Sequence, residues 1–131
     1  MQYLLDTNII SQAAYEPRGH VAGRIQRLQH LICTSIIVAA ELRFGVAKRA
    51  SSALAERIGA LLDEIEVLPL LPPVDRIYAE LRADLEKRGN LIGANDLFIA
   101  AHALALGCAM VTDNEREFSR VNGLTVENWL R

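Results

Sequence analysis

Residues 92–113 read IGANDLFIAAHALALGCAMVTD, and this stretch decides the fold. Its first part, 95–106, is apolar almost all round, which predicts a helix buried against a sheet. Gly107 stops that helix, because glycine readily adopts the conformation that ends helices. The apolar residues 109–112 predict a strand that ends at Asp113. A buried helix followed at once by a strand is typical of an α/β protein.

The rest of the chain repeats this alternation of strands and helices. Apolar runs predict strands at 2–5, 31–34, 67–70, 109–112 and 124–126. Helical spacing predicts helices at 20–30, 36–49, 54–65 and 74–85, and Asp6, Thr7 or Asn8 can cap a short helix that runs through 11–14. Such alternation predicts a mainly parallel sheet of about four to five strands, covered by helices on both faces. At 131 residues and 51% hydrophobic, the chain is expected to fold as one domain, 1–131.

Composition narrows the class of protein. No apolar run approaches the roughly 18 residues of a membrane span, and no basic leader precedes the first strand. We therefore expect a cytoplasmic protein with no membrane partner. Cys33 and Cys108 lie in apolar contexts without metal-type spacing, which predicts two buried thiols rather than a disulfide. The formal net charge of −2 disfavours a nucleic-acid partner, but setting aside four acids of one site changes it to +2.

Those four acids stand in apolar stretches, with no basic residue placed to neutralise them. They are Asp6, Glu41, Asp96 and Asp113. Asp6 and Asp113 each end a predicted strand, and the carboxyl ends of parallel strands share one edge of the sheet. Asp96 lies in the first turn of its helix, where the helix dipole also favours an acid. Helix capping or turn formation would explain Asp6 and Asp113 singly, but together the four predict a site.

Glu41 is the acid that a surface role explains least well. Its neighbours three and four positions away along the helix are apolar or small, namely Ile37, Val38, Phe44 and Gly45. The carboxylate therefore emerges from the apolar face, where it either serves a site or is bonded to a loop amide. By contrast, Asp84 has Lys87 and Arg88 beside it, as a solvated helix face should.

Converging carboxylates must take up protons or bind cations. Two of them about 4 Å apart repel by roughly 4 kcal/mol at an effective dielectric near 20. All-oxygen ligands suit Mg²⁺ or Mn²⁺, whereas zinc would favour Cys or His, and His20, His30 and His102 show no ligand pairing. The expected chemistry is activation of a water against a phosphodiester, with a second ion as an option.

Four segments in order along the chain carry a resemblance to a known family. They are LLDTNIIS (4–11), VAAEL (38–42), IGANDLFIAAHALALG (92–107) and VTDNEREFSRVNGLTVENW (111–129). Together these segments resemble the PIN-domain ribonucleases, and most closely the VapC toxins of bacterial toxin–antitoxin pairs.

The resemblance implies both a site and partners. It implies that Asp6, Glu41, Asp96 and Asp113 form a metal-binding catalytic centre with Mg²⁺ or Mn²⁺. It also implies an α/β/α sandwich, a homodimer, and inhibition by a VapB-type antitoxin whose tail enters the acidic groove. The implied substrate is RNA, with tRNA as a candidate because several members of the family cut it.

Several polar residues near the four acids have two interpretations. Thr7, Asn8 and Thr112 could orient the carboxylates, or could serve turns and caps. Asn114 with Glu117 fits a capping box. The basic residues that could contact phosphate, or merely be solvated surface, are Arg43, Lys48, Arg49, Arg116 and Arg120.

Two alternatives belong to other classes of protein. In an aspartyl-phosphate enzyme Asp6 would be a nucleophile, but a dehalogenase-type motif would want a second Asp at Asn8. The lysines of the chain, Lys48 and Lys87, also lie away from predicted strand ends. In a non-catalytic binding module, the acidic pocket would only receive a basic peptide.

Overall fold

Parallel strands form the central sheet of this protein. The structure, a computed structural model, describes residues 2–131. Within that range five strands lie in the order β3-β2-β1-β4-β5, and every neighbouring pair is parallel. The strands are β1 (Tyr3–Leu5), β2 (Ile32–Ser35), β3 (Glu66–Leu68), β4 (Ala109–Val111) and β5 (Val126–Glu127). Their carboxyl ends therefore meet at one edge, as the sequence predicts.

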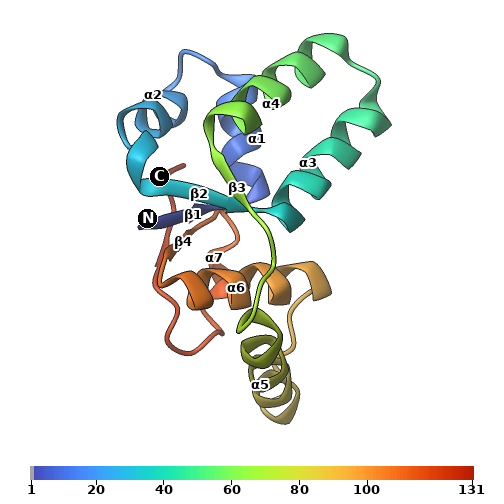
Figure 1. The fold of residues 1–131 in the computed structure, drawn as a ribbon, viewed down its shortest axis with the longest axis vertical. Coiled ribbons are helices and arrows are strands. Elements are labelled where there is room, and N and C mark those ends of the chain that lie inside the picture. Colours follow the sequence, from blue (N-terminus) through green and yellow to red (C-terminus); the bar gives the residue numbers. More distant parts are fainter. Residues whose placement is uncertain (1) are drawn as a thin grey trace.

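Helices cover both faces of this sheet. They are α1 (Thr7–Tyr15), α2 (His20–Arg27), α3 (Ile36–Arg49), α4 (Ser52–Glu64), α5 (Val74–Lys87), α6 (Ala94–Leu106) and α7 (Glu115–Phe118). A 3-10 turn, η1 (Gln29–Leu31), leads into β2. Figure 1 shows α1, α2 and α4 on one side of the sheet and α5 and α6 on the other. The predicted α/β/α sandwich is confirmed. No helix within residues 2–131 is long and apolar enough to cross a membrane.

Helix α6 is buried against the sheet, as its composition predicts. Leu97, Ile99, Ala100 and Ala103 are each at most 2% exposed. Gly107 ends the helix with a φ of 68°, a left-handed conformation that costs glycine little. His102 is also buried in this helix, and its Nδ1 lies 2.8 Å from the Ser35 hydroxyl. It is thus a satisfied core histidine.

The starts and ends of two elements have identifiable reasons. The first helix begins at Thr7, because the Asp6 carboxylate accepts a hydrogen bond from the Thr7 backbone N–H and caps it, which confirms one of the three caps that the sequence offers. The third strand ends at Leu68 rather than at residue 70, because Pro69 has no N–H to donate to a strand ladder.

The thiol prediction is confirmed for both cysteines. Cys33 and Cys108 are 0% and 5% exposed, and neither is in a disulfide. Trp129, near the carboxyl end, is also buried, with Tyr3 against its ring edge at 5.4 Å between centroids. This contact anchors the last residues of the chain beside β1, next to the edge where the acids lie.

Candidate metal centre

Asp6 is the most enclosed acid of the site. It follows β1 directly and is 4% exposed. Thr112 Oγ1 donates to its Oδ2 at 2.6 Å, the Thr7 backbone N–H to its Oδ1 at 2.8 Å, and Asn8 Nδ2 to its Oδ2 at 3.4 Å. Burial raises the pKa of Asp6, while these donors lower it and the charge of Glu41 raises it further. The predicted orienting contacts of Thr7, Asn8 and Thr112 are therefore present.

Glu41 reaches the same point from α3. Thr7 Oγ1 donates to its Oε1 at 2.7 Å, and Asn95 Nδ2 donates to its Oε2 at 3.4 Å. Thr7 thus bonds Asp6 through its backbone and Glu41 through its side chain. The carboxylate is half-buried and points toward the sheet edge, as its apolar helical neighbours predict.

Asp96 joins Asp6 and Glu41 from the first turn of α6. Burial, a side-chain hydrogen bond with Glu117 and the negative charges of Asp6, Glu117 and Glu41 raise the pKa of Asp96 to about 8. Asp96 and Glu117 are thus paired carboxyls, joined by a side-chain hydrogen bond. We call Asp6, Glu41, Asp96 and Glu117 the carboxylate cluster.

Glu117 is the member of this cluster that sequence reasoning missed. The hydrogen bond from Asp96 lowers its pKa, and the Gly93 backbone N–H also bonds it. The predicted capping box is wrong in its geometry, because Asn114 Nδ2 donates to the Glu117 side chain at 2.7 Å and the Asn114 side chain caps no backbone N–H. The available signal was a second acid one turn beyond Asp113, hidden within a polar stretch.

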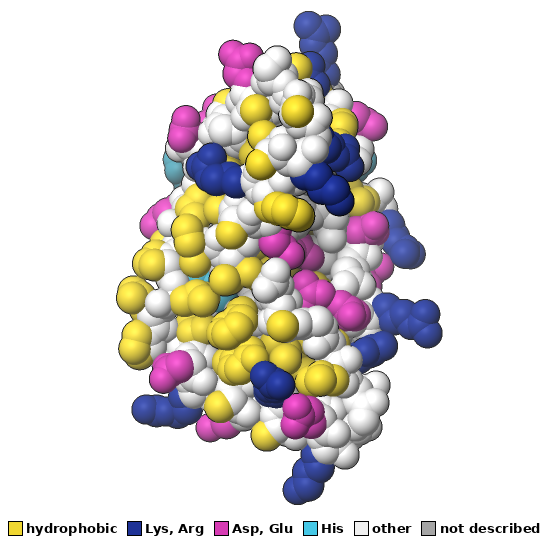
Figure 2. Space-filling model, turned by 90° about the vertical axis from the view of Figure 1, so that its right-hand side faces the viewer, with side chains coloured by type: hydrophobic (Ala, Val, Ile, Leu, Met, Phe, Trp, Pro, Cys, Tyr) yellow, Lys and Arg dark blue, Asp and Glu magenta, His cyan; other side chains and the backbone are white. Residues whose placement is uncertain are grey.

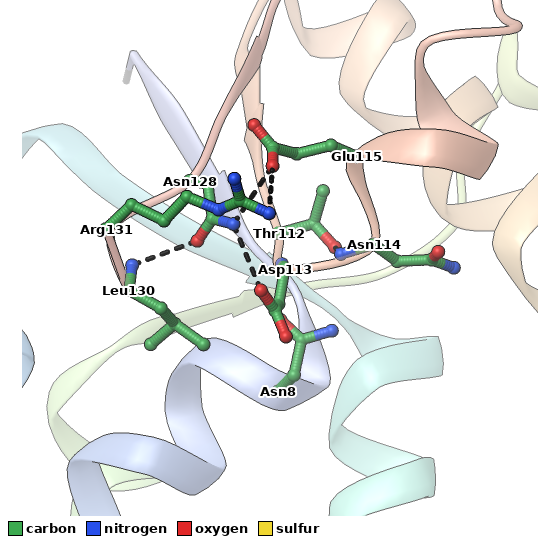
Figure 3. A network of polar contacts seen from close by, with 8 residues as sticks. All are labelled: Asn8, Thr112, Asp113, Asn114, Glu115, Asn128, Leu130 and Arg131. Atoms are coloured by element: carbon green, nitrogen blue, oxygen red, sulfur yellow. Dashed lines mark hydrogen bonds and ion pairs between the residues drawn. The ribbon is translucent and has the colours of Figure 1, made fainter.

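Asp113 stands at the rim of the site rather than inside it. Its side chain is exposed and accepts a hydrogen bond from Asn128 Nδ2 at 3.0 Å, while its backbone N–H donates to Asn8 Oδ1 at 2.9 Å. Figure 3 shows this network, in which Asn128 also donates to Glu115 at 3.2 Å. The structure therefore brings three of the four predicted acids into the cluster and sets Asp113 beside it.

The donor set of this site fits a hard divalent ion. In residues 2–131 the ion pairs involve other acids, so no arginine or lysine forms an ion pair with the carboxylate cluster, and the charge of Arg120 acts on Glu117, whose pKa it lowers. Burial and the neighbouring negative charges both raise the pKa of Asp96, and a cation bound among these carboxylates would oppose both effects. Among the described residues, no three Asp, Glu, His or Cys side chains are already close enough together to hold one metal ion. Carboxylate oxygens suit Mg²⁺ or Mn²⁺.

A groove of about 450 Å³ opens beside these acids, between α1, α3 and α4. Thr7, Glu41 and Asp113 line one end, and Tyr15 and Arg49 line the other. We call this hollow the groove.

The other predicted phosphate contacts lie elsewhere. Arg43, Lys48 and Arg116 are exposed and do not line the groove. Arg120 donates to the backbone oxygen of Leu91 at 3.2 Å, so its guanidinium already has a partner within the protein.

Comparison with known proteins places this architecture in a family. The family profile described as PIN domain matches residues 3–124. The chain belongs to the PIN-domain family. Membership in the PIN-domain family disfavours the aspartyl-phosphate alternative, as do the donors that already occupy both oxygens of Asp6.

The similar PIN-domain proteins are VapC ribonucleases. Ribonuclease VapC2 of Rickettsia felis is 36% identical over an alignment of 132 positions, which covers 98% of each chain. The tRNA(fMet)-specific endonuclease VapC of Shigella flexneri is 33% identical over 98% of each chain.

Solved structures agree with this grouping. VapBC2 from Rickettsia felis, bound to a DNA fragment from the promoter, matches with a TM-score of 0.89 and 36% identity, covering 98% of this chain and 99% of the other. DNA-bound VapBC from Salmonella typhimurium matches with a TM-score of 0.87 and 30% identity over 98% of each chain. The recognition of a VapC-type PIN domain is thereby confirmed.

Proposed function

We propose that this chain is the toxin of a VapBC-type toxin–antitoxin pair and hydrolyses phosphodiester bonds of RNA with Mg²⁺ or Mn²⁺. The observation that carries the proposal is the carboxylate cluster at the carboxyl edge of a parallel sheet, in a chain whose relatives are named ribonucleases. We propose that the protein acts in the cytoplasm, where RNA substrates of this kind are found.

Each acid has a distinct role in this proposal. Asp6, Glu41 and Asp96 would hold the ion, directly or through water, and Asp113 at the rim would complete the site or orient the attacking water. When bound, the ion would lower the pKa of a water and stabilise negative charge on phosphoryl oxygens. Glu117 would position Asp96 through their hydrogen bond.

The polar partners hold this arrangement before substrate arrives. Thr112 and Thr7 donate to Asp6, and Thr7 and Asn95 donate to Glu41, so both carboxylates keep fixed orientations. A preorganised set of ligands avoids the cost of ordering them during the reaction.

Among RNAs, tRNA is the first substrate to test. The Shigella flexneri relative is named a tRNA(fMet)-specific endonuclease, and it covers 98% of this chain. We therefore propose tRNA as the substrate class to screen before other structured RNAs.

The proposed protein partner is a VapB-type antitoxin. The similar solved structures are VapBC complexes, and the acidic end of the groove is complementary to a basic peptide tail. The antitoxin would then inhibit by covering the carboxylate cluster.

The proposed second partner is another copy of this chain. Ile36, Ala40 and Phe44 recur every four residues on α3, and Ile36 and Phe44 are 46% and 68% exposed. Figure 2, viewed from the side on which α3 lies in Figure 1, shows acidic side chains near the middle of the molecule and hydrophobic ones above and, mostly, below them. An exposed apolar face of this kind is typical of a homodimer interface.

Cleavage of pooled tRNA by antitoxin-free protein tests the proposed activity. We expect cutting with Mg²⁺ or Mn²⁺, none with chelator, and a loss of at least about a hundredfold in Asp96→Asn. Asp84→Asn is the matched control, because Asp84 is half-buried on α5, away from the site, and pairs with Arg88 at 2.7 Å. Absence of cutting by folded, metal-binding protein would favour a non-catalytic module that only receives a peptide. Cutting that survives chelator and Asp96→Asn would contradict the mechanism.

A further inference from the structure

The far end of the groove carries an aromatic and a cationic side chain that the metal site does not use. Tyr15 ends α1 and is 50% exposed, and Arg49 ends α3. The Arg49 guanidinium lies 5.7 Å from the centre of the Tyr15 ring and Arg49 Nη1 donates to the Tyr15 hydroxyl. A phenol ring left half exposed in a groove is an available stacking surface.

The two helices set this pair at a defined distance from the acids. Tyr15 lies eight residues after Thr7 on α1, and Arg49 lies eight residues after Glu41 on α3. At 1.5 Å per residue each span is about 12 Å, a length that roughly two to four nucleotides of a single strand cover. Leu42, Val46 and Ile58 line the groove between its two ends.

The groove is negative at the end with the acids and positive at the end with Arg49, an arrangement that suits a nucleic acid bound along it. Glu41 and Asp113 make one end negative, where a divalent ion would compensate the scissile phosphate. A neighbouring phosphate needs a positive group of its own, and Arg49 is the basic residue lining this groove.

We propose that Tyr15 and Arg49 form a nucleotide subsite in which an RNA base stacks on the Tyr15 ring and a backbone phosphate contacts Arg49. This inference rests on the proposed ribonuclease function and assigns the pair to substrate binding, not to the chemical step. Stacking on an aromatic ring tolerates any base, so the subsite would position the strand without choosing its sequence.

Binding of fluorescently labelled pooled tRNA to the Asp96→Asn protein, with Mn²⁺ present, tests the subsite. Adding Tyr15→Ala should weaken binding at least about fivefold without changing its salt dependence, whereas Tyr15→Phe should retain most of it. Adding Arg49→Gln should weaken binding and reduce the slope of log K against log salt by about 0.7. Arg76→Gln, an exposed arginine of α5 outside the groove, is the matched control and should change neither.

Cleavage kinetics separate this inference from the proposed function. In otherwise intact protein, Tyr15→Ala and Arg49→Gln should raise KM for tRNA and leave kcat within about twofold, since they remove binding only. If the wild type cuts RNA but Tyr15→Ala and Arg49→Gln leave KM, affinity and salt slope unchanged, the subsite is overturned and the ribonuclease function is not. The nucleotide subsite would also be overturned if Tyr15→Ala and Arg49→Gln weakened binding of a basic antitoxin peptide and had no effect on RNA binding. Failure of the wild type to cut would count against the ribonuclease, while the binding series would still decide the subsite.

Discussion

At the scale of single residues, Asp6 depends on a neighbour whose contribution can be isolated. Thr112 Oγ1 donates to Asp6 at 2.6 Å and accepts from the Asn114 backbone N–H at 2.9 Å, while Thr34 Oγ1 donates to the Leu5 backbone oxygen at 2.7 Å on an adjacent strand. Both threonines are fully buried. The pair therefore allows a comparison between a hydrogen bond that serves the site and one that serves only the sheet.

Thr112→Val should lower metal affinity and cleavage by about tenfold to a hundredfold, because Asp6 loses the donor that orients it. Thr34→Val, the matched control, should cost about 1 kcal/mol of stability and leave cleavage near wild type. Mn²⁺ titration and kcat at saturating RNA measure the difference. Equal losses of activity in the two variants would mean that Thr112 acts through general stability.

Three of the four site acids were predictable from sequence because their local surroundings are apolar. Glu41 and Asp96 have apolar helical neighbours, and Asp6 ends an apolar strand. Glu117 could not be found in this way, since it lies in a polar stretch that resembles solvated surface. Asp113 stays a prediction as a site residue, because ending a strand fixes its backbone position but not the direction of its side chain.

At the scale of elements, α6 carries a buried histidine that links it to the start of α3. Its ring contacts the Ser35 hydroxyl, which in turn accepts from the Ile37 backbone N–H, and it also bonds the Pro69 carbonyl. Burial lowers the pKa of His102, so the folded protein holds the neutral imidazole.

Because the pKa of His102 is lower in the folded state, the unfolded chain takes up this proton first as pH falls. The stability that His102 contributes is complete above about pH 6.5 and is lost as pH falls below that value. We expect the free energy of unfolding of His102→Gln to fall less than that of the wild type between about pH 7 and 5. His30→Gln, at an exposed position, should follow the wild type. Parallel denaturation curves for His102→Gln and wild type would contradict this assignment.

Element types and order were predictable because strand and helix periodicities in this chain are strong. Their boundaries were less predictable: the sequence offered the Asp6 cap that starts α1 at Thr7, but the apolar run at 67–70 did not show that β3 ends at Leu68. The order of the strands in the sheet was not predictable, because parallel pairing leaves open which strands are neighbours.

At the scale of the whole molecule, the exposed α3 face predicts self-association. Phe44→Glu places a charge on the most exposed large hydrophobic residue of that face, 68% exposed, and should convert a dimer to a monomer. Light scattering after size-exclusion chromatography measures the mass. Arg27→Glu, an exposed position on α2, is the control and should leave the mass unchanged. A Phe44→Glu protein that stays dimeric would place the interface elsewhere.

The carboxylate cluster makes the stability of the whole protein depend on a divalent ion. Four acids from β1, α3, α6 and α7 repel one another unless a proton or a cation intervenes. An ion bound only by the folded state adds about 2.7 kcal/mol at a hundredfold excess over its dissociation constant. The same substitutions that stop cleavage should therefore also remove this stabilisation.

The most direct test of the account is thermal unfolding with and without Mn²⁺ for wild type, Glu41→Gln, Asp96→Asn and the Asp84→Asn control. The account predicts a rise in Tm with Mn²⁺ for wild type and Asp84→Asn, and a much smaller rise for Glu41→Gln and Asp96→Asn, which should stay folded. An unchanged Mn²⁺-dependent shift in Glu41→Gln and Asp96→Asn would show that these residues do not hold the ion and would contradict the proposed centre.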